Sequence, residues 1–261
     1  MIYKRVCEAR FVKRLNRFVS ICNLEGQDIS VHVPNTGRCA ELFIPGAPVI
    51  LNHCSDEAAK TRKTVYDLVS IYKGDLLINL DSQAPNAIVE EALKNSVLNP
   101  SWDVTYLKRE QTFGDSRFDI YYHRKAQGNL PDGGLEHDAI APKNTKLAPD
   151  EIQGFIEVKG VTLEEDGLVY FPDAPTARGR KHLHELISAK NQGYEAAIEF
   201  VVQMDEASMF YPRSETDPQF AHDLALCQKA GVTIQAHSCK VTPDRVILDH
   251  SIDICDLSYY L

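Results

Sequence analysis

Two stretches decide how the second half of this chain folds: residues 113–122 read Phe-Gly-Asp-Ser-Arg-Phe-Asp-Ile-Tyr-Tyr, and residues 155–163 read Phe-Ile-Glu-Val-Lys-Gly-Val-Thr-Leu. In the first stretch, Asp119 lies within an apolar run. In the second, Glu157 and Lys159 flank a valine on a segment with the pattern of a short buried strand, so their side chains share one face. Two acids and a lysine on buried strands cost free energy unless they pair with one another or hold a metal ion.

An aspartate on one strand followed by Glu-x-Lys on a later strand is the spacing of the metal-dependent PD-(D/E)xK nucleases. Mg²⁺ and Mn²⁺ fit such a site, because Mg²⁺ takes oxygen ligands and needs only a few carboxylates. Asp119 and Glu157 are the candidate ligands, and the Val158 carbonyl could add an oxygen. Lys159 would orient or deprotonate the attacking water. The plain alternative is that these residues form ordinary ion pairs, Glu157 with Lys159 and Asp119 with Arg117.

The bulk composition is that of a soluble globular protein. The chain has 261 residues and a net charge of −9, so any contact with nucleic acid must come from a local basic patch. It contains no long apolar run and no secretory signal, which predicts no membrane association. Its seven cysteines include no CxxC pair, so we expect reduced thiols in a cytoplasmic protein.

The pattern of strands and helices divides the chain into two predicted domains. Residues 1–82 read as a β-rich domain, which fits a small OB-like barrel, although an SH3-like barrel would give a similar pattern. Its strands are predicted at residues 11–24, 27–33, 48–53, 64–72 and 75–80. Residues 83–261 alternate helices with strands and predict a layered α/β domain.

The elements of the second domain follow from caps and periodicity. The first helix is predicted over residues 86–95, with Asn86 as its N-cap and Glu90 and Glu91 as sources of a third acid. Later helices are predicted over 176–191 and 218–230, and strands over 101–109, 116–122, 154–161, 196–204 and 232–239. Residues 124–151 are polar, rich in glycine and proline, and read as an inserted loop that could act as a lid.

Two basic clusters are candidates for binding nucleic acid. In the first, Lys13, Arg14 and Arg17 are flanked by Phe11 and Phe18, which suits a groove with stacking rings. The alternative is that the two rings belong to the barrel core and that the lysine and the arginines lie on a solvated face.

The second basic cluster opens the helix that follows Thr176, its predicted N-cap. Its members are Arg178, Arg180, Lys181 and His182, and Thr176 belongs with them to the residues predicted to bind nucleic acid. Cations at a helix N-terminus oppose the helix dipole, so this arrangement favours a helix start that faces phosphate.

Taken together, these motifs resemble the SfsA family, the sugar fermentation stimulation protein A homologues, over nearly the whole chain. The motifs that carry the resemblance are Val31-His-Val-Pro-Asn-Thr-Gly37, Pro45-Gly46, Pro85-Asn86, Glu91-Ala-Leu93, Phe113-Gly114, Ser116-Arg117-x-Asp119, Ile156-Glu-Val-Lys159, Val161-Thr-Leu163, Tyr170-Phe-Pro-Asp-Ala174, Thr176-x-Arg178-Gly179-x-Lys181-His182-Leu183 and Glu185-Leu186.

The resemblance implies an OB-like barrel followed by a PD-(D/E)xK, restriction-endonuclease-like α/β domain. It also implies DNA binding without marked sequence preference and a regulatory link to sugar (maltose) metabolism. Carried onto this sequence, the site would be Asp119, Glu157 and Lys159, with Glu91 favoured over Glu90 as the helix acid because it directly precedes an alanine. Arg117 joins the nucleic-acid-binding set. Two features depart from the family pattern: Gly160, where Asn or Ser is usual, and the long insertion at 124–151.

Two functions follow as hypotheses. The first is a DNA-binding protein whose metal site hydrolyses phosphodiester bonds with Mg²⁺ or Mn²⁺. The second is a non-catalytic, sequence-nonspecific DNA-binding regulator linked to sugar metabolism. A sugar-binding regulator has less in its favour, because Trp102 is the single tryptophan and no aromatic platform is evident. DNA is favoured over RNA, while the strand form of the substrate and the oligomeric state stay open.

Overall fold

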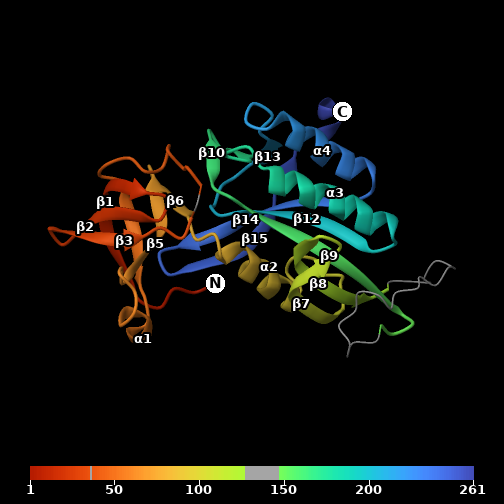
Figure 1. The fold of residues 1–261 in the computed structure, drawn as a ribbon, viewed down its shortest axis with the longest axis horizontal. Coiled ribbons are helices and arrows are strands. Elements are labelled where there is room, and N and C mark those ends of the chain that lie inside the picture. Colours follow the sequence, from red (N-terminus) through yellow and green to blue (C-terminus); the bar gives the residue numbers. More distant parts are fainter. Residues whose placement is uncertain (36, 127–146) are drawn as a thin grey trace.

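The computed structural model describes residues 1–35, 37–126 and 147–261. Figure 1 shows two bodies side by side, a small barrel built from the N-terminal part of the chain and a larger layered α/β domain. In the described ranges, no helix is long and apolar enough to cross a membrane.

The N-terminal domain is a closed barrel of five strands with a sixth strand appended. Its elements are β1 (Val6–Asn16), β2 (Val19–Leu24), β3 (Gln27–His32), β4 (Pro48–His53), α1 (Asp56–Ala59), β5 (Tyr66–Lys73) and β6 (Leu76–Asn79). The strand order is β3-β2-β1-β4-β5-β6, and pairing of β3 with β5 closes the ring. This confirms the OB-like barrel. The single strand predicted over 11–24 is a hairpin, β1 and β2, which turns at Arg17 and Phe18.

The second domain is built on a six-stranded sheet with the order β15-β14-β12-β9-β8-β7. Its elements are α2 (Ala84–Lys94), β7 (Val104–Phe113), β8 (Ser116–Lys125), β9 (Glu151–Val161), α3 (Ala177–Asn191), β12 (Glu195–Val202), α4 (Pro218–Lys229), β14 (Thr233–Thr242) and β15 (Arg245–Ser251). The three central strands β9, β12 and β14 run parallel, and the outer strands pair antiparallel.

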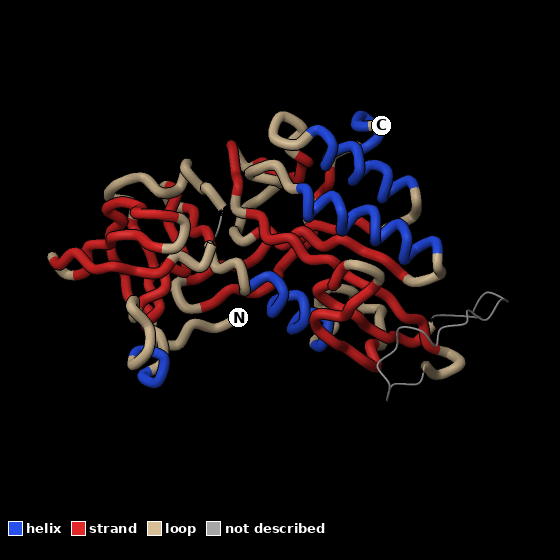
Figure 2. The backbone as a smooth tube through the Cα atoms, in the orientation of Figure 1, coloured by secondary structure: helices blue, strands red, loops and turns tan. Residues whose placement is uncertain are grey.

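Helices cover both faces of this sheet, α2 on one side and the neighbouring α3 and α4 on the other (Figures 1 and 2). Strand β12 is therefore buried on both faces, as its continuous apolar sequence predicts. Ile198 and Phe200 belong to the core under α3 and α4, whereas Ala197 and Val201 belong to the core under α2.

A second, four-stranded sheet was not predicted. It has the order β10-β11-β13-β16, from β10 (Leu163–Glu165), β11 (Leu168–Phe171), β13 (Met209–Pro212) and β16 (Asp253–Ile254). A short 3₁₀ helix, η1 (Leu257–Tyr260), follows it. Strands of two to four residues are too short to show a period in the sequence.

The two domains meet between β6, which ends at Asn79, and α2, which begins at Ala84. The first residues of the chain cross this boundary, since the Met1 ammonium contacts Glu91 of α2 and Ile2 bridges to Arg245. Most of the predicted insertion, residues 127–146, lies outside the described residues, and so does the lid predicted there. The seven cysteines are free thiols.

Candidate metal and nucleic-acid site

The two acids singled out in the sequence lie where the central sheet divides. Strands β8 and β9 pair as far as Ile120 and Ile156, and there the pairing ends. Asp119 and Glu157 are the next residue on each strand, so they flank the opening. Strand β9 continues beside β12 as far as Val161, which keeps Glu157 and Lys159 on a rigid element.

Asp119 is held in place by two hydrogen bonds. The Asn86 side-chain amide of α2 donates to Oδ1 at 2.8 Å, and the Val158 backbone N–H donates to Oδ2 at 2.9 Å. Burial raises the pKa of Asp119, and the neighbouring Glu157 carboxylate raises it further. Because Val158 directly follows Glu157, the second hydrogen bond places the Asp119 carboxylate beside the backbone of β9 at that glutamate.

Glu157 is buried, with 1% of its surface exposed. Its Oε1 is in contact with two groups, the Lys159 ammonium and the ring nitrogen Nδ1 of His182. Burial alone would raise the pKa of Glu157, but the Lys159 ammonium and the His182 ring outweigh it and hold the pKa below its ordinary value. The other oxygen, Oε2, is buried and has no hydrogen-bond partner among the described residues.

The predicted helix acid is not brought to this pair. Glu91 is five residues beyond Asn86, about 140° around the helix axis, and its side chain is 54% exposed. Its Oε2 pairs with the Met1 ammonium at 2.9 Å. Glu90 pairs instead with Lys94 at 2.6 Å. The α2 side chain that contacts Asp119 is therefore the amide of Asn86 and not the predicted carboxylate of Glu91.

Asn86 also has a different role from the predicted N-cap. Helix α2 is preceded by Gln83 and has proline in its first turn. The side chain of Asn86 is thereby left to bind Asp119.

The donor set is small and rich in oxygen. Across residues 1–35, 37–126 and 147–261, no three His, Cys, Asp or Glu side chains converge as a ready metal cage. A Mg²⁺ ion can be held by one or two carboxylates together with water and substrate phosphate, so two acids do not exclude one.

The N-terminal basic cluster divides into a structural residue and exposed ones. The Arg14 guanidinium donates to the backbone carbonyls of Asn16, Arg17, Asn35, Gly37 and Arg38, and it stacks on Phe43 at 4.5 Å. Its donors are therefore committed to the barrel, and the prediction that Arg14 binds phosphate is corrected. Lys13 and Arg17 are exposed.

The two rings beside this cluster also differ from each other. Phe11 is a core residue, as the alternative reading had it, whereas Phe18 is 52% exposed.

The second basic cluster opens α3 as predicted, but one member points inward. Thr176 is the N-cap, and its Oγ1 accepts from the Gly179 N–H at 3.0 Å. Arg178 and Lys181 are exposed. His182 is buried on Glu157, because it shares the buried stripe of α3 with Leu186, four residues on. It positions the acid and is not free to bind nucleic acid.

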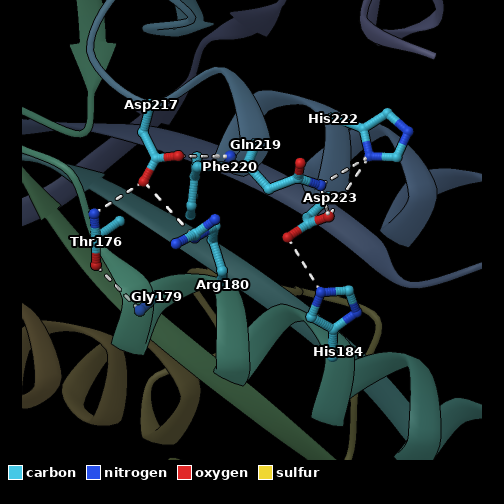
Figure 3. A network of polar contacts seen from close by, with 9 residues as sticks. All are labelled: Thr176, Gly179, Arg180, His184, Asp217, Gln219, Phe220, His222 and Asp223. Carbon is cyan, nitrogen blue, oxygen red and sulfur yellow. Dashed lines mark hydrogen bonds and ion pairs between the residues drawn. The ribbon is translucent and has the colours of Figure 1, made fainter.

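A polar network that the sequence did not suggest ties α3 to α4 (Figure 3). The Thr176 N–H donates to Asp217, the N-cap of α4, at 2.8 Å, so the two helix starts are joined. Arg180 Nε lies 3.9 Å from the same carboxylate. Farther along, His184 and Gln219 bind the buried Asp223 at 3.1 and 2.9 Å.

The last predicted contact, Arg117, is exposed on β8 and lies 3.4 Å from Glu110. Arg117 lies two residues before Asp119 on the strand. Its side chain points away from the face that carries its neighbour Phe118, which is buried in the core.

Comparison with known proteins decides the family. The family model described as "Sugar fermentation stimulation protein RE domain" matches residues 83–245, and "SfsA N-terminal OB domain" matches residues 12–80. This chain belongs to the SfsA family. Relatives named "Sugar fermentation stimulation protein homolog" include one from Alkaliphilus oremlandii, 42% identical over 97% of this chain and 98% of the relative. Another, from Clostridium perfringens, is 44% identical over 95% of this chain and 96% of the relative.

A solved structure of the SfsA family has the same fold. SfsA of Pyrococcus furiosus, described in complex with Ca²⁺, superimposes with a TM-score of 0.77 at 25% identity, over 97% of both chains. The two SfsA domains therefore correspond to the barrel and the α/β domain described above.

Proposed function

We propose that this SfsA-family protein binds DNA and hydrolyses phosphodiester bonds with a divalent metal ion, Mg²⁺ or Mn²⁺, at Asp119, Glu157 and Lys159. The observation that carries the proposal is the convergence of two carboxylates at the split between β8 and β9, with a lysine beside them. An Asp where the pairing of β8 and β9 ends, followed by a Glu-x-Lys on β9, is what the proposed PD-(D/E)xK site requires.

The residues fit a divalent cation. Glu157 Oε2 is buried without a hydrogen-bond partner among the described residues, which is costly for a carboxylate unless something else occupies that position. The Asp119 oxygens each accept one hydrogen bond and retain lone pairs for a ligand. The P. furiosus protein is described in complex with Ca²⁺, which also takes oxygen ligands, and this supports a site for a divalent cation.

A metal ion bound there would lower the pKa of a water and neutralise charge on the scissile phosphate. The chain's own groups would do the rest. Lys159 lies beside Glu157, where its ammonium can orient the attacking water and stabilise the negative charge that develops on the phosphate. Asn86 and His182 are positioning residues, which fix the orientations of Asp119 and Glu157.

DNA would be held by the predicted lysine and arginine side chains that are exposed. On the barrel these are Lys13 and Arg17, on β8 Arg117, and at the start of α3 Arg178 and Lys181. If Lys13 and Arg17 contact phosphates, replacing both by alanine will weaken binding and flatten its dependence on salt. An unchanged salt slope would remove that patch from the proposal.

The direct test is cleavage by a matched pair of variants. Lys159→Ala should abolish Mg²⁺- and Mn²⁺-dependent cleavage of DNA and leave DNA binding largely intact. Lys94→Ala is the control, since Lys94 also pairs with a glutamate, at 2.6 Å, but at the far end of α2. If the wild-type protein cleaves neither single-stranded nor duplex DNA nor RNA with either metal, the enzymatic proposal fails.

One observation favours the second candidate, a non-catalytic DNA-binding regulator. Lys159 and His182 already contact Glu157 Oε1, so much of the charge of the acid is compensated by the protein itself. In that case the same residues would stabilise the fold. Lys159→Ala would lower the stability of the protein, and the wild-type protein would cleave no DNA. The names of the relatives, which refer to stimulation of sugar fermentation, are compatible with such a regulator.

A further inference from the structure

A cavity of about 440 Å³ lies between the barrel and the α/β domain. This volume is in the range of sites that enclose one small molecule, about 300–1,000 Å³. Both domains contribute to its wall. The lining residues include Arg17, Arg38, Gly160, Ala174, Thr176 and Gln203.

Three segments that carry residues of the proposed site also line this cavity. Gly160 directly follows Lys159, and Pro85 directly precedes Asn86. Thr176 begins α3, the helix that carries His182. The cavity therefore adjoins the segments that carry the acid pair and its lysine, although Asp119, Glu157 and Lys159 are not themselves among its lining residues.

The chemistry of the wall suits a phosphate-bearing ligand. Arg17 and Arg38 are exposed guanidinium groups, and Asp173 is the single carboxylate among the described lining residues. Thr176 places the N-terminus of the 15-residue helix α3 at the same wall, where the dipole favours an anion.

A buried acceptor faces the cavity as well. Gln203 is 1% exposed, and its amide nitrogen donates to Asn79 at 2.8 Å and to the Asp81 carbonyl at 3.1 Å. These bonds fix the side chain and leave its oxygen over Gly160, where an added Cβ would lie 2.5 Å from that oxygen. Glycine at 160 is thus required for the close approach. The fixed oxygen can accept a hydrogen bond from an N–H donor, such as the exocyclic amine of a base.

The barrel side of the cavity is preorganised. Arg14 binds the carbonyls of Arg17, Asn35, Gly37 and Arg38, which holds both arginines' backbones in place. The Arg38 N–H in turn donates to Asp173 at 3.2 Å, across the domain boundary.

We propose that this cavity receives one unpaired nucleotide of a DNA strand, so that the protein engages single strands or strand ends in preference to intact duplex. The inference rests on the proposed DNA-binding function. A base inside a duplex must first leave its stack to enter a cavity of this size, at a cost of a few kcal/mol that an already unpaired base does not bear. Bound there, the nucleotide would direct its neighbouring phosphate toward Asp119, Glu157 and Lys159.

The experiment compares binding of a labelled single strand and of the blunt duplex of the same sequence by fluorescence anisotropy, in EDTA so that nothing is cleaved. We expect the wild-type protein to bind the single strand at least about tenfold more tightly than the duplex. Arg38→Ala, and Ala174→Trp, which fills the cavity, should each weaken single-strand binding by roughly tenfold and leave duplex binding nearly unchanged. Arg245→Ala, an exposed arginine of β15 outside the cavity, should change neither, and melting curves verify that each variant folds.

Equal affinities of the wild-type protein for single strand and duplex would overturn the inference, and so would an equal loss of both in the cavity variants. Those results leave the proposed DNA-binding function standing, because duplex DNA would still bind. If neither DNA binds, the proposed function itself fails, and the inference fails with it.

Discussion

Replacing Lys159 by methionine tests whether Glu157 is a buried charge compensated by its neighbours. The substitution keeps the aliphatic stem and removes only the ammonium, which contacts Glu157 Oε1. Glu157 then retains one partner, His182, in a position that is 1% exposed.

The magnitude follows from the burial of the pair. Removing one partner of a buried ion pair costs about 3–5 kcal/mol of unfolding free energy. The Lys159 side chain is 15% exposed and His182 remains in contact, so we expect a smaller loss, about 2–3 kcal/mol. The matched variant Lys94→Met breaks a lysine–glutamate pair whose lysine is 60% exposed, and should cost only about 0.3–0.5 kcal/mol.

Urea unfolding followed by tryptophan fluorescence measures both variants. Trp102 is the single tryptophan, and its ring stacks on Tyr122 of β8 at 4.9 Å, so the signal reports on the domain that holds the site. Equal destabilisation by Lys159→Met and Lys94→Met would refute the reasoning, because the Glu157 pair would then behave as an exposed one.

Further predictions concern the metal, the positioning residues and pH. Mn²⁺ at a hundredfold excess over its Kd should stabilise the wild-type protein by about 2.7 kcal/mol, and Asp119→Asn should remove this gain in thermal unfolding. Asn86→Ala should lower cleavage by about 10- to 100-fold with little change in DNA affinity; an unaltered rate would show that Asn86 does not position Asp119. The pKa of Glu157 is lower in the folded protein than its ordinary 4.5, so its stabilising contribution is full above that value and is lost as pH falls through the folded pKa. As the pH is lowered below 4.5, the free energy of unfolding should therefore fall more steeply for the wild-type protein than for Glu157→Gln. Parallel curves would contradict the lowered pKa of Glu157.

Much of the architecture followed from sequence because local pattern and tertiary structure agree. The apolar run of β12 predicted a strand covered on both faces, and Thr176 predicted the start of α3. The small sheet of β10, β11, β13 and β16 escaped prediction, since its strands are held by pairing with distant segments and not by a periodic pattern of their own.

The sequence predicted the placement of Asp119 and Glu157 on neighbouring strands, but it did not predict which residue of α2 faces them. Asp119 and Glu157 meet because consecutive strands of the domain pair antiparallel up to these residues. The choice of Glu91 failed because α2 presents Asn86 to Asp119, which places residue 91 on another side of the helix. The spacing of His182 from Leu186 was a usable signal that the histidine faces inward.

The role of Arg14 could not be read from its neighbours in sequence. Three of the carbonyls it binds, those of Asn35, Gly37 and Arg38, are 21 to 24 residues away along the chain. Only the folded barrel brings them around one guanidinium.

Diffraction from crystals soaked in Mn²⁺ tests the central claim most directly. An anomalous difference map would locate the ion without reference to activity. We expect a peak between the carboxylates of Asp119 and Glu157, with Glu157 Oε2 among its ligands, and no such peak in Asp119→Asn crystals. A wild-type map with no peak there, and with Lys159 and His182 still on Glu157, would contradict the metal site and leave the three residues as a structural ion-pair cluster.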